Sequence, residues 1–404
     1  MPVPEELLAQ LRRFPDVEAP NLFAADSADR LILDEAGQSL RDARPGTVVV
    51  IGDRYGALTL GAVAGFGANE VRVHQDPLTG EQALAANAER AGLAGYRNCA
   101  LGEDLLAGAT VVLLQLPRSL TALAEIAEAV ARYADPDAVV YAGGRIKHLT
   151  VAMNEVLGRS FADVHATLAR QKSRVLVARG VLPVPQESTF PLRERIEELD
   201  LEVVAHGAAF AGTKLDIGTR FLLASVPRMD PSAERAVDLG CGTGILAIEL
   251  ARARPGLRVV ATDQSVAAVD SAAATGFPVE WWGGGGAPPA ARGGGVAPAA
   301  PTAAANGVGD RVTALRDDAM STLADGSVDL VVCNPPFHVG AAVHTGAALA
   351  MFRAAGRVLR PGGELWTVYN SHLGYRGALR SAVGGTEVIA RNPKFTVTRS
   401  VKGE

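Results

Sequence analysis

The chain has 404 residues, of which 48% are hydrophobic and 21% are charged, so it is long enough for two domains and too apolar for a disordered chain. Its three cysteines, Cys99, Cys241 and Cys333, lie far apart, which argues against a disulfide framework and against a cysteine-based zinc site. The formal net charge of −5 gives the chain as a whole no basic footprint of the kind that nucleic acids attract.

The N-terminal segment is amphipathic and acidic, and it lacks the apolar core of a signal peptide. No apolar run reaches the roughly 18 residues that a membrane-spanning helix needs. These two features predict a cytoplasmic protein without a membrane span.

In the first half, short β-branched runs alternate with longer stretches rich in Ala and Leu, which is typical of an α/β fold. Each predicted strand is followed by a polar or Gly-containing loop, and a helix is expected over residues 119–133. The strands are Thr47–Ile51, followed by Gly52-Asp53-Arg54-Tyr55-Gly56; Glu70–His74, followed by an acid at Asp76; Ala109–Leu114, followed by Gln115-Leu116-Pro117-Arg118; and Ala138–Tyr141.

The second half repeats this order. Its strands are Arg235–Leu239, followed by a Gly-rich turn and a helix over 245–253; Arg258–Thr262, followed by Asp263; a third strand at 311–316; and Val328–Cys333, followed by Asn334-Pro335-Pro336-Phe337. We interpret the match as an internal duplication of a Rossmann-like unit with a doubly wound, mostly parallel sheet. The predicted domains are residues 1–185, a degenerate copy, and residues 186–404, the copy that retains its motifs.

Two segments fall outside this pattern. Pro183–Asp200 is rich in Pro and charge and is predicted to be the linker, with a connecting strand at Leu201–Ala208 and the second domain under way by Leu215–Leu223. Gly276–Thr302 is a Gly/Pro/Ala-rich insert that we expect to be flexible, because its composition buries too little apolar surface to offset the entropy of ordering.

The turn Asp238–Gly244 predicts a cofactor site. Gly240, Gly242 and Gly244 allow a ligand to approach the backbone at the start of a helix. Their G-x-G-x-G spacing differs from the G-x-G-x-x-G of dinucleotide sites, and Asp238 would repel a pyrophosphate, which disfavours a nicotinamide dehydrogenase. S-adenosylmethionine suits the turn better, because its cationic amine can face acidic and carbonyl groups.

Two further acids extend this site. Asp263 lies about 20 residues after the Gly turn at the end of the next strand, where an acid accepts hydrogen bonds from ribose hydroxyls. Asp317 and Asp318 follow the third strand, and we assign Asp318 to the adenine amino group.

The strongest signal is Asn334-Pro335-Pro336-Phe337. It places an amide oxygen, a rigid backbone carbonyl and an aromatic face at the carboxyl edge of the sheet, where doubly wound folds bind ligands. Two acceptors, from Asn334 and Pro335, can hold the hydrogens of a planar exocyclic amine and point its lone pair at a methyl sulfonium, while Phe337 stacks on the ring. His338 is assigned to substrate contact.

A basic stretch lies in the first half, although the chain is acidic overall. Between Tyr141 and Gly180 there are seven basic residues against Glu155 and Asp163 only. Lys172, Arg174 and Arg179, together with Arg145 and Lys147, are the residues that we expect to follow a phosphate backbone.

Together these motifs resemble the bacterial rRNA guanine-N2 methyltransferases, a family of class I S-adenosylmethionine-dependent enzymes. The resemblance covers nearly the whole chain, and the segments that carry it are Ala142–Ala178, Val203–Leu223, the tetrapeptide from Asn334 with His338, and Met351–Leu365. Asn370–Tyr375 and Asn392-Pro393-Lys394-Phe395 are more similar to the large-subunit (23S) branch. The family has two methyltransferase-like domains, of which the first lacks the cofactor and helps to hold RNA, and this is what the resemblance implies for residues 1–185.

The resemblance therefore implies an enzyme that methylates the N2 amine of a guanine in rRNA, naked or in a ribosomal particle. We expect the protein to be a monomer. Other interpretations stay open: 16S rRNA as the substrate, N-methylation of DNA adenine or of a protein glutamine, and a non-catalytic RNA-binding pseudoenzyme. No metal is assigned, because the seven histidines show no H-x-x-x-H or H-E-x-x-H spacing.

Overall fold

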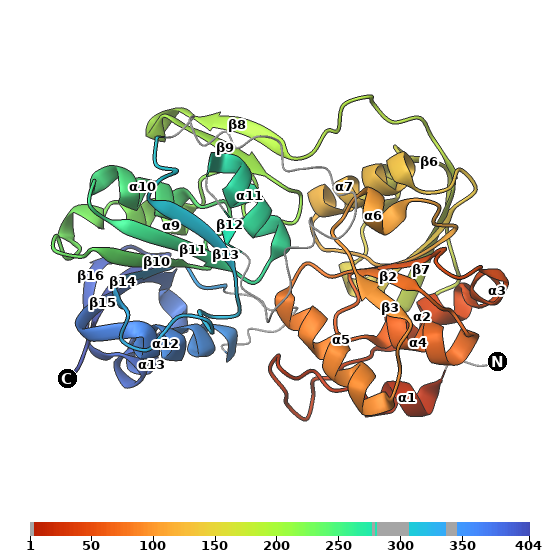
Figure 1. Ribbon diagram of the computed structural model, residues 1–404, viewed down its shortest axis with the longest axis horizontal. Helices are drawn as coiled ribbons and strands as arrows, with labels where there is room; N and C mark the ends of the chain where they lie inside the picture. The colour runs from red at the N-terminus through yellow and green to blue at the C-terminus, as the bar shows by residue number, and fades with distance from the viewer. Residues whose placement is uncertain (1–3, 277–278, 281–306, 337–345) are drawn as a thin grey trace. The chain divides into compact units, whose positions relative to one another are not determined.

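The computed structural model describes residues 4–276, 279–280, 307–336 and 346–404 (Figure 1). The described chain divides between Phe190 and Pro191 into two compact units, each built around its own sheet. None of the helices in the described part of the chain is long and apolar enough to cross a membrane. The predicted fold class, two tandem doubly wound α/β units, is confirmed.

The first unit contains a seven-stranded sheet in the order β3-β2-β1-β4-β5-β7-β6. Its first five members are parallel, and β7 and β6 add an antiparallel edge next to β5. Alternate residues of β1 belong to separate apolar clusters on the two faces, as expected for a strand that is covered on both sides. The strands are β1 (Val48–Ile51), β2 (Val71–His74), β3 (Tyr96–Asn98), β4 (Val111–Gln115), β5 (Val139–Arg145), β6 (Phe161–Ala166) and β7 (Ser173–Val181).

Helices cover both faces of this sheet. Leu31 to Leu33 pack into one cluster with residues of four other helices, and Leu123 and Met153 pack into the other. The first face carries α1 (Glu5–Gln10), α2 (Ser27–Glu35), α3 (Gly37–Asp42), α4 (Ala57–Phe66) and α5 (Leu78–Ala91); the second carries α6 (Glu103–Leu106), α7 (Leu120–Tyr133) and α8 (Val151–Leu157). A 3₁₀ turn, η1 (Ile146–His148), follows β5.

The second unit repeats this arrangement with the order β12-β13-β11-β10-β14-β15-β17-β16. The predicted bounds of Arg235–Leu239 and Val328–Cys333 are confirmed residue for residue. The strands are β10 (Arg235–Leu239), β11 (Arg258–Asp263), β12 (Val279–Glu280), β13 (Val312–Arg316), β14 (Val328–Cys333), β15 (Leu359–Asn370), β16 (Gly384–Arg391) and β17 (Phe395–Lys402).

The helices of this unit again form two layers. One face is covered by α9 (Ile217–Leu223), α10 (Ile245–Ala253) and α11 (Val266–Gly276), and the other by α12 (Gly346–Val358) and α13 (Arg376–Ala382). A 3₁₀ turn, η6 (Ser371–Leu373), follows β15, as η1 follows β5.

The hydrogen-bonding registers align the two units position by position. Ile51 pairs with Leu114 across β1 and β4, and Leu239 pairs with Cys333 across β10 and β14. Because both loops that follow begin at a Gly with φ +76 and end at a left-handed Gly before a helix, Gln115 corresponds to Asn334. The expected equivalence of the two tetrapeptides therefore follows from the backbone itself.

Two predictions need correction. The predicted linker contains a strand, β8 (Leu192–Ile196), which pairs with β9 (Leu201–Ala205), because Ile196 at its apolar end packs against the second unit's core. The acid expected at Asp76 is not the counterpart of Asp263: the register places Gln75 there. Apart from Gly276 and the two residues of β12, the Gly276–Thr302 insert lies outside the described residues.

Candidate functional site

The Gly turn lies where β10 ends and α10 begins. Gly240, Gly242 and Gly244 have φ values of +76, +54 and +81, a left-handed backbone that favours glycine. A Cβ on Gly242 would meet no heavy atom closer than the Phe210 carbonyl oxygen at 3.8 Å, so space beside the turn is free. The turn therefore presents open backbone to a ligand at the start of a helix.

Asp238 lies beneath this turn. Its side chain is fully buried, and Oδ2 accepts a hydrogen bond from the Ala247 amide of α10 at 3.1 Å. Oδ1 is buried and accepts no hydrogen bond from the described residues. Burial, with a smaller contribution from the charge of Asp263, raises the pKa of Asp238 to about 7.

Asp263 connects neighbouring loops at the same sheet edge. Its Oδ2 accepts from the Gly242 amide at 3.1 Å, and its backbone carbonyl accepts from the Asp317 amide at 3.0 Å. Asp317 is buried and bonds to the Thr322 amide and hydroxyl, so its carboxylate serves the loop. Asp318, the acid that the sequence analysis assigns to adenine, is half-buried.

Asn334 directly follows β14, and its amide group has a fixed orientation. Its Nδ2 donates to Asp216 Oδ2 and to Thr219 Oγ1, each at 3.0 Å. A carboxylate only accepts, so the nitrogen of the amide must face Asp216. The Asn334 Oδ1 atom is thereby turned away, is buried, and accepts no hydrogen bond from the described residues. Buried acceptors in proteins are normally hydrogen-bonded, so this oxygen is a candidate to accept a hydrogen bond from a ligand.

Asp216 and Thr219 are candidate site residues that the sequence did not reveal, because they are identified only by their contacts to Asn334. Asp216 caps α9 by accepting from the Thr219 amide at 3.0 Å, so one carboxylate both starts the helix and orients Asn334. Between them lies Gly218, where a Cβ would approach Asn334 Oδ1 to 3.4 Å. The available signal was the N-cap pattern at the start of Ile217–Leu223, which predicts a helix but no partner.

Pro335 follows Asn334 and is buried. Phe337 and His338, the predicted stacking and substrate contacts, lie outside the described residues. The structure therefore brings together Asp238, the Gly turn, Asp263, Asp318 and Asn334 at the carboxyl ends of adjacent strands, where ligands bind in doubly wound folds.

The corresponding positions of the first unit are occupied by its own side chains. Asp53, in the turn after β1, accepts from the Gly56 and Thr59 amides at 3.0 and 2.8 Å. The Gln75 amide donates to the Asp53 carbonyl, and the Gln115 amide donates to Asp29 of α2. The Asp53 carboxylate and the amide nitrogens of Gln75 and Gln115 thus bond within this unit, whereas Gln115 Oε1, like Asn334 Oδ1, is buried and accepts no hydrogen bond from the described residues.

The structure divides the predicted basic stretch. Arg145 pairs with Ser173 across β5 and β7, and the Ile146 amide donates to the Lys172 carbonyl, so Arg145, Lys147, Lys172 and Arg174 lie near one sheet edge. Arg170 is neutralised by Asp34 and Glu35 at 2.6 and 2.9 Å. Arg159 and Arg179 lie toward the opposite end of β7, where Arg179 is across from Asp163.

The buried cysteines and the possible metal ligands add less to this candidate site. Burial raises the pKa of the Cys241 and Cys333 thiols, which suits packing and disfavours nucleophilic attack. Within the described ranges, no cluster of three or more His, Cys, Asp or Glu side chains is arranged to hold a metal ion.

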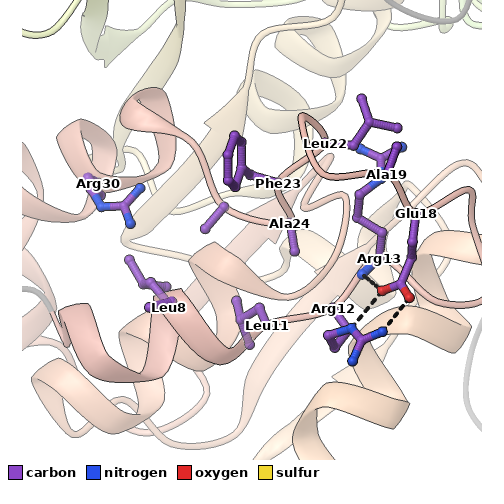
Figure 2. Close-up of a pocket in the computed structure, with 12 residues that line it drawn as sticks. Leu8, Leu11, Arg12, Arg13, Glu18, Ala19, Leu22, Phe23, Ala24 and Arg30 are labelled. Carbon is purple, nitrogen blue, oxygen red and sulfur yellow. Dashed lines mark hydrogen bonds and ion pairs between the residues drawn. The ribbon is translucent and has the colours of Figure 1, made fainter.

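A cavity of about 580 Å³ lies in the N-terminal part of the first unit, between α1 and the loop that leads to α2 (Figure 2). Phe23 borders it, and its three arginines are each paired with an acid: Arg12 with Glu18, Arg13 with Asp16 and Arg30 with Glu5. No predicted site residue lines this cavity.

The Asp216→Asn variant is expected to lower kcat/KM by about 10- to 100-fold with little loss of stability. The new oxygen can still cap α9, but the new NH₂ group can donate to Asn334 Oδ1 and occupy the free acceptor. Steady-state kinetics and the melting temperature test this. Thr219→Val, which removes one acceptor and adds no donor, should be milder; equal activity in Asp216→Asn and wild type would contradict the role of Asp216.

Each of the two units matches a known protein family. Residues 4–181 match the family model "RLMG N-terminal domain", and residues 200–277 and 294–399 match "Methyltransferase small domain". A Pseudomonas paraeruginosa protein named ribosomal RNA large subunit methyltransferase G is 34% identical over 97% of each chain, and its Streptomyces avermitilis namesake is 32% identical over 97% of this chain and 96% of its own.

One solved structure has the same two-unit fold. The T. thermophilus 16S rRNA N2 guanine methyltransferase RsmC, solved with AdoMet and guanosine, superposes with a TM-score of 0.69 over 96% of this chain and 97% of its own. At 22% identity, this similarity is one of fold.

Proposed function

The chain belongs to the ribosomal RNA large subunit methyltransferase G family, and from this premise we propose that it transfers a methyl group from S-adenosylmethionine to the N2 amine of a guanine in 23S rRNA. The observation that carries the proposal is Asn334 Oδ1, which is buried, accepts no hydrogen bond from the described residues, and lies in the same unit as an open Gly turn. The single experiment that tests it is mass spectrometry of rRNA nucleosides from a strain lacking the gene. The expected result is the loss of one N2-methylguanine from the large-subunit RNA, and an unchanged nucleoside profile would contradict the proposal.

The residues at the second unit's sheet edge fit S-adenosylmethionine. Gly242 leaves room for a ligand beside the backbone, and Asp238 offers a buried carboxylate oxygen without a partner. Asp263 and Asp318 add acidic groups at neighbouring strand ends for ribose and adenine. Three acids suit a cofactor with a cationic amine, and they oppose a dinucleotide pyrophosphate. When bound, the cofactor supplies a methyl group on a positively charged sulfur, open to attack by a nitrogen lone pair.

Asn334 holds the target amine. Its Oδ1 accepts one N–H of the planar exocyclic amine, and the adjacent backbone carbonyl of the Pro335 segment accepts the other. Since Asp216 and Thr219 fix the amide, this acceptor is in place before substrate binds. Two acceptors on one nitrogen orient its lone pair toward the methyl group and stabilise the positive charge that develops there. The proton leaves after the new N–C bond forms, so no described side chain must first act as a base.

The substrate must present its base out of the stack, because the amine of a stacked and paired guanine is out of reach. We propose that Arg145, Lys147, Lys172 and Arg174 of the first unit contact the rRNA backbone, Phe337 stacks on the guanine, and His338 contacts the substrate. Lys172 lies in a hairpin turn where it and Gln171 have φ values of +60 and +47, a strained backbone that sets the lysine at an exposed tip. We further propose that the protein works in the cytoplasm as a monomer without a metal ion.

Cofactor affinity is expected to rise with pH between about 6 and 8. The pKa of Asp238 is raised to about 7, so the side chain is mostly protonated at the lower end, half ionised near pH 7 and mostly a carboxylate at the upper end. Because a cationic amine binds the carboxylate better, the Kd for S-adenosylmethionine should fall as the pH increases. Calorimetric titration at several pH values measures this. Asp238→Asn should bind more weakly at pH 7 and show a flatter dependence; an identical slope in both proteins would exclude Asp238 as the cause.

A further inference from the structure

The carboxyl edge of the first unit's sheet carries a group of cationic side chains from three separate loops. Arg54 comes from the turn after β1, Arg118 from the loop after β4, and the remainder from the end of β5 and η1. We call this group the cationic edge; its members are Arg54, Arg118, Arg145 and Lys147, and the His148 imidazole lies beside them.

These residues occupy positions that correspond to the catalytic edge of the second unit. The matched turns place Arg54 opposite Gly242, and Arg118, three residues after Gln115, takes the sequence position of Phe337. The registers of β5 and β15 likewise match Arg145 with Asn370, and therefore Lys147 with His372. At each of these four positions the first unit has a cationic side chain, whereas the second unit has a small, amide or aromatic residue.

The members of the cationic edge also lie close together in space. Arg118 Nη2 is 3.5 Å from His148 Nε2. Partial burial and then the charges of Arg118, Lys147, Arg54 and Arg145 lower the pKa of His148, so all four cations lie within electrostatic reach of one imidazole. Three loops far apart in sequence therefore combine into one positive surface.

The charges of the cationic edge are not paired within the described part of the chain. Within the described residues, no member of the cationic edge forms an ion pair, whereas Arg170 on the same unit pairs with two acids. The Asp29 and Asp53 carboxyls are buried, and burial raises the pKa of both, that of Asp29 to about 7. Arg54, Arg118 and Lys147 are exposed, so their charges face solvent.

We propose that the cationic edge is a binding site for phosphodiester groups of the rRNA substrate, built on the positions that in the second unit serve catalysis. The inference rests on the proposed function for the identity of the RNA. Several unpaired cations attract phosphates and release counterions on binding. They would repel a cationic cofactor, and the Asp53 carboxylate is bonded to backbone amides of its own turn. The carboxyl edge of the first unit's sheet therefore lacks the motif residues of the second unit but remains a ligand-binding surface, with RNA phosphates as its ligand.

The test compares two double variants that remove the same charge. Arg118→Gln with Lys147→Gln alters the cationic edge, and Arg159→Gln with Arg179→Gln alters exposed arginines toward the opposite end of β7. Binding to a 23S rRNA transcript is measured from 50 to 300 mM KCl for both and for wild type. The edge variant should bind more weakly, and the slope of log affinity against log salt should fall in magnitude by about 2, one per lost phosphate contact. The control should retain the wild-type slope.

Melting temperature and S-adenosylmethionine affinity are measured on the same proteins and should be unchanged, because no altered residue lies in the second unit. The single variant Arg118→Gln, with an expected slope change of about 1, replaces the double variant if the latter is unstable. Unchanged RNA affinity and slope in the edge variants would overturn the proposal, and so would equal losses in edge and control variants, which indicate a diffuse field. Absence of rRNA methylation by the wild-type protein would instead contradict the proposed function.

Discussion

Asn334→Ala is expected to lower the rate of methyl transfer by on the order of 10²–10³-fold or more, while the affinity for S-adenosylmethionine stays within about twofold of wild type. The substitution removes the buried acceptor Oδ1 that holds the target amine. It leaves Asp238, the Gly turn and Asp263 in place, and these groups make the contacts proposed for the cofactor. Single-turnover kinetics with a 23S rRNA transcript and calorimetric titration with the cofactor measure the two quantities separately.

The matched control is Gln115→Ala, at the corresponding position of the first unit. It also removes an amide that follows a parallel strand and donates to a residue of the helix layer, Asp29. The control is expected to lose stability, because a buried carboxyl loses its donor, yet to keep the single-turnover rate at saturating RNA. Wild-type turnover by Asn334→Ala would refute the mechanism, and an equal loss of rate in both variants would assign the effect to general destabilisation.

Gly242→Arg is expected to weaken S-adenosylmethionine binding by about 100-fold, equivalent to roughly 3 kcal/mol. A side chain at Gly242 would enter the open space beside the turn, and the guanidinium would place a positive charge where a cationic cofactor binds. The φ value of +54 adds about 1–2 kcal/mol of strain for a residue with a Cβ, so the melting temperature should also fall by a few degrees. Equilibrium titration and thermal unfolding check both effects.

The arginine at this position copies the first unit, where Arg54 occupies the corresponding place. The reciprocal variant Arg54→Gly should leave cofactor affinity unchanged, since the Asp53 carboxylate is still bonded to backbone amides of its own turn. Gly242→Ala separates strain from bulk: it shares the unfavourable φ but projects only a methyl group. If Gly242→Arg bound the cofactor as tightly as wild type, the open space beside the turn would not be the cofactor site.

The sequence alone determined the fold class, the duplication and the location of the motifs. Arg235–Leu239 and Val328–Cys333 were predicted with their observed bounds, because a parallel strand buried on both faces is a continuous apolar run that ends at a Gly turn or an Asn-Pro. The Asn334 tetrapeptide and the G-x-G-x-G turn are likewise local patterns. Because local patterns are visible in the order of residues, the chemistry of these motifs and the family resemblance follow from the sequence, and the relatives bear the family out.

The tertiary structure decided which side chains act together. Asp216 lies 118 residues before Asn334, and only the packing of α9 against the sheet brings them to 3.0 Å and leaves Oδ1 free. Strand register, which is a non-local property, made Gln75 and not Asp76 the counterpart of Asp263.

The charged residues also show what the sequence determines and what only the fold decides. The sequence located a basic stretch by counting neighbours along the chain, but it grouped Arg170 and Arg179 with residues at another edge. It also omitted Arg54 and Arg118, which reach His148 from two other loops. Secondary structure follows from short-range sequence pattern, whereas a binding surface is assembled from loops that parallel strands carry to a common edge. Only the fold determines which loops meet there.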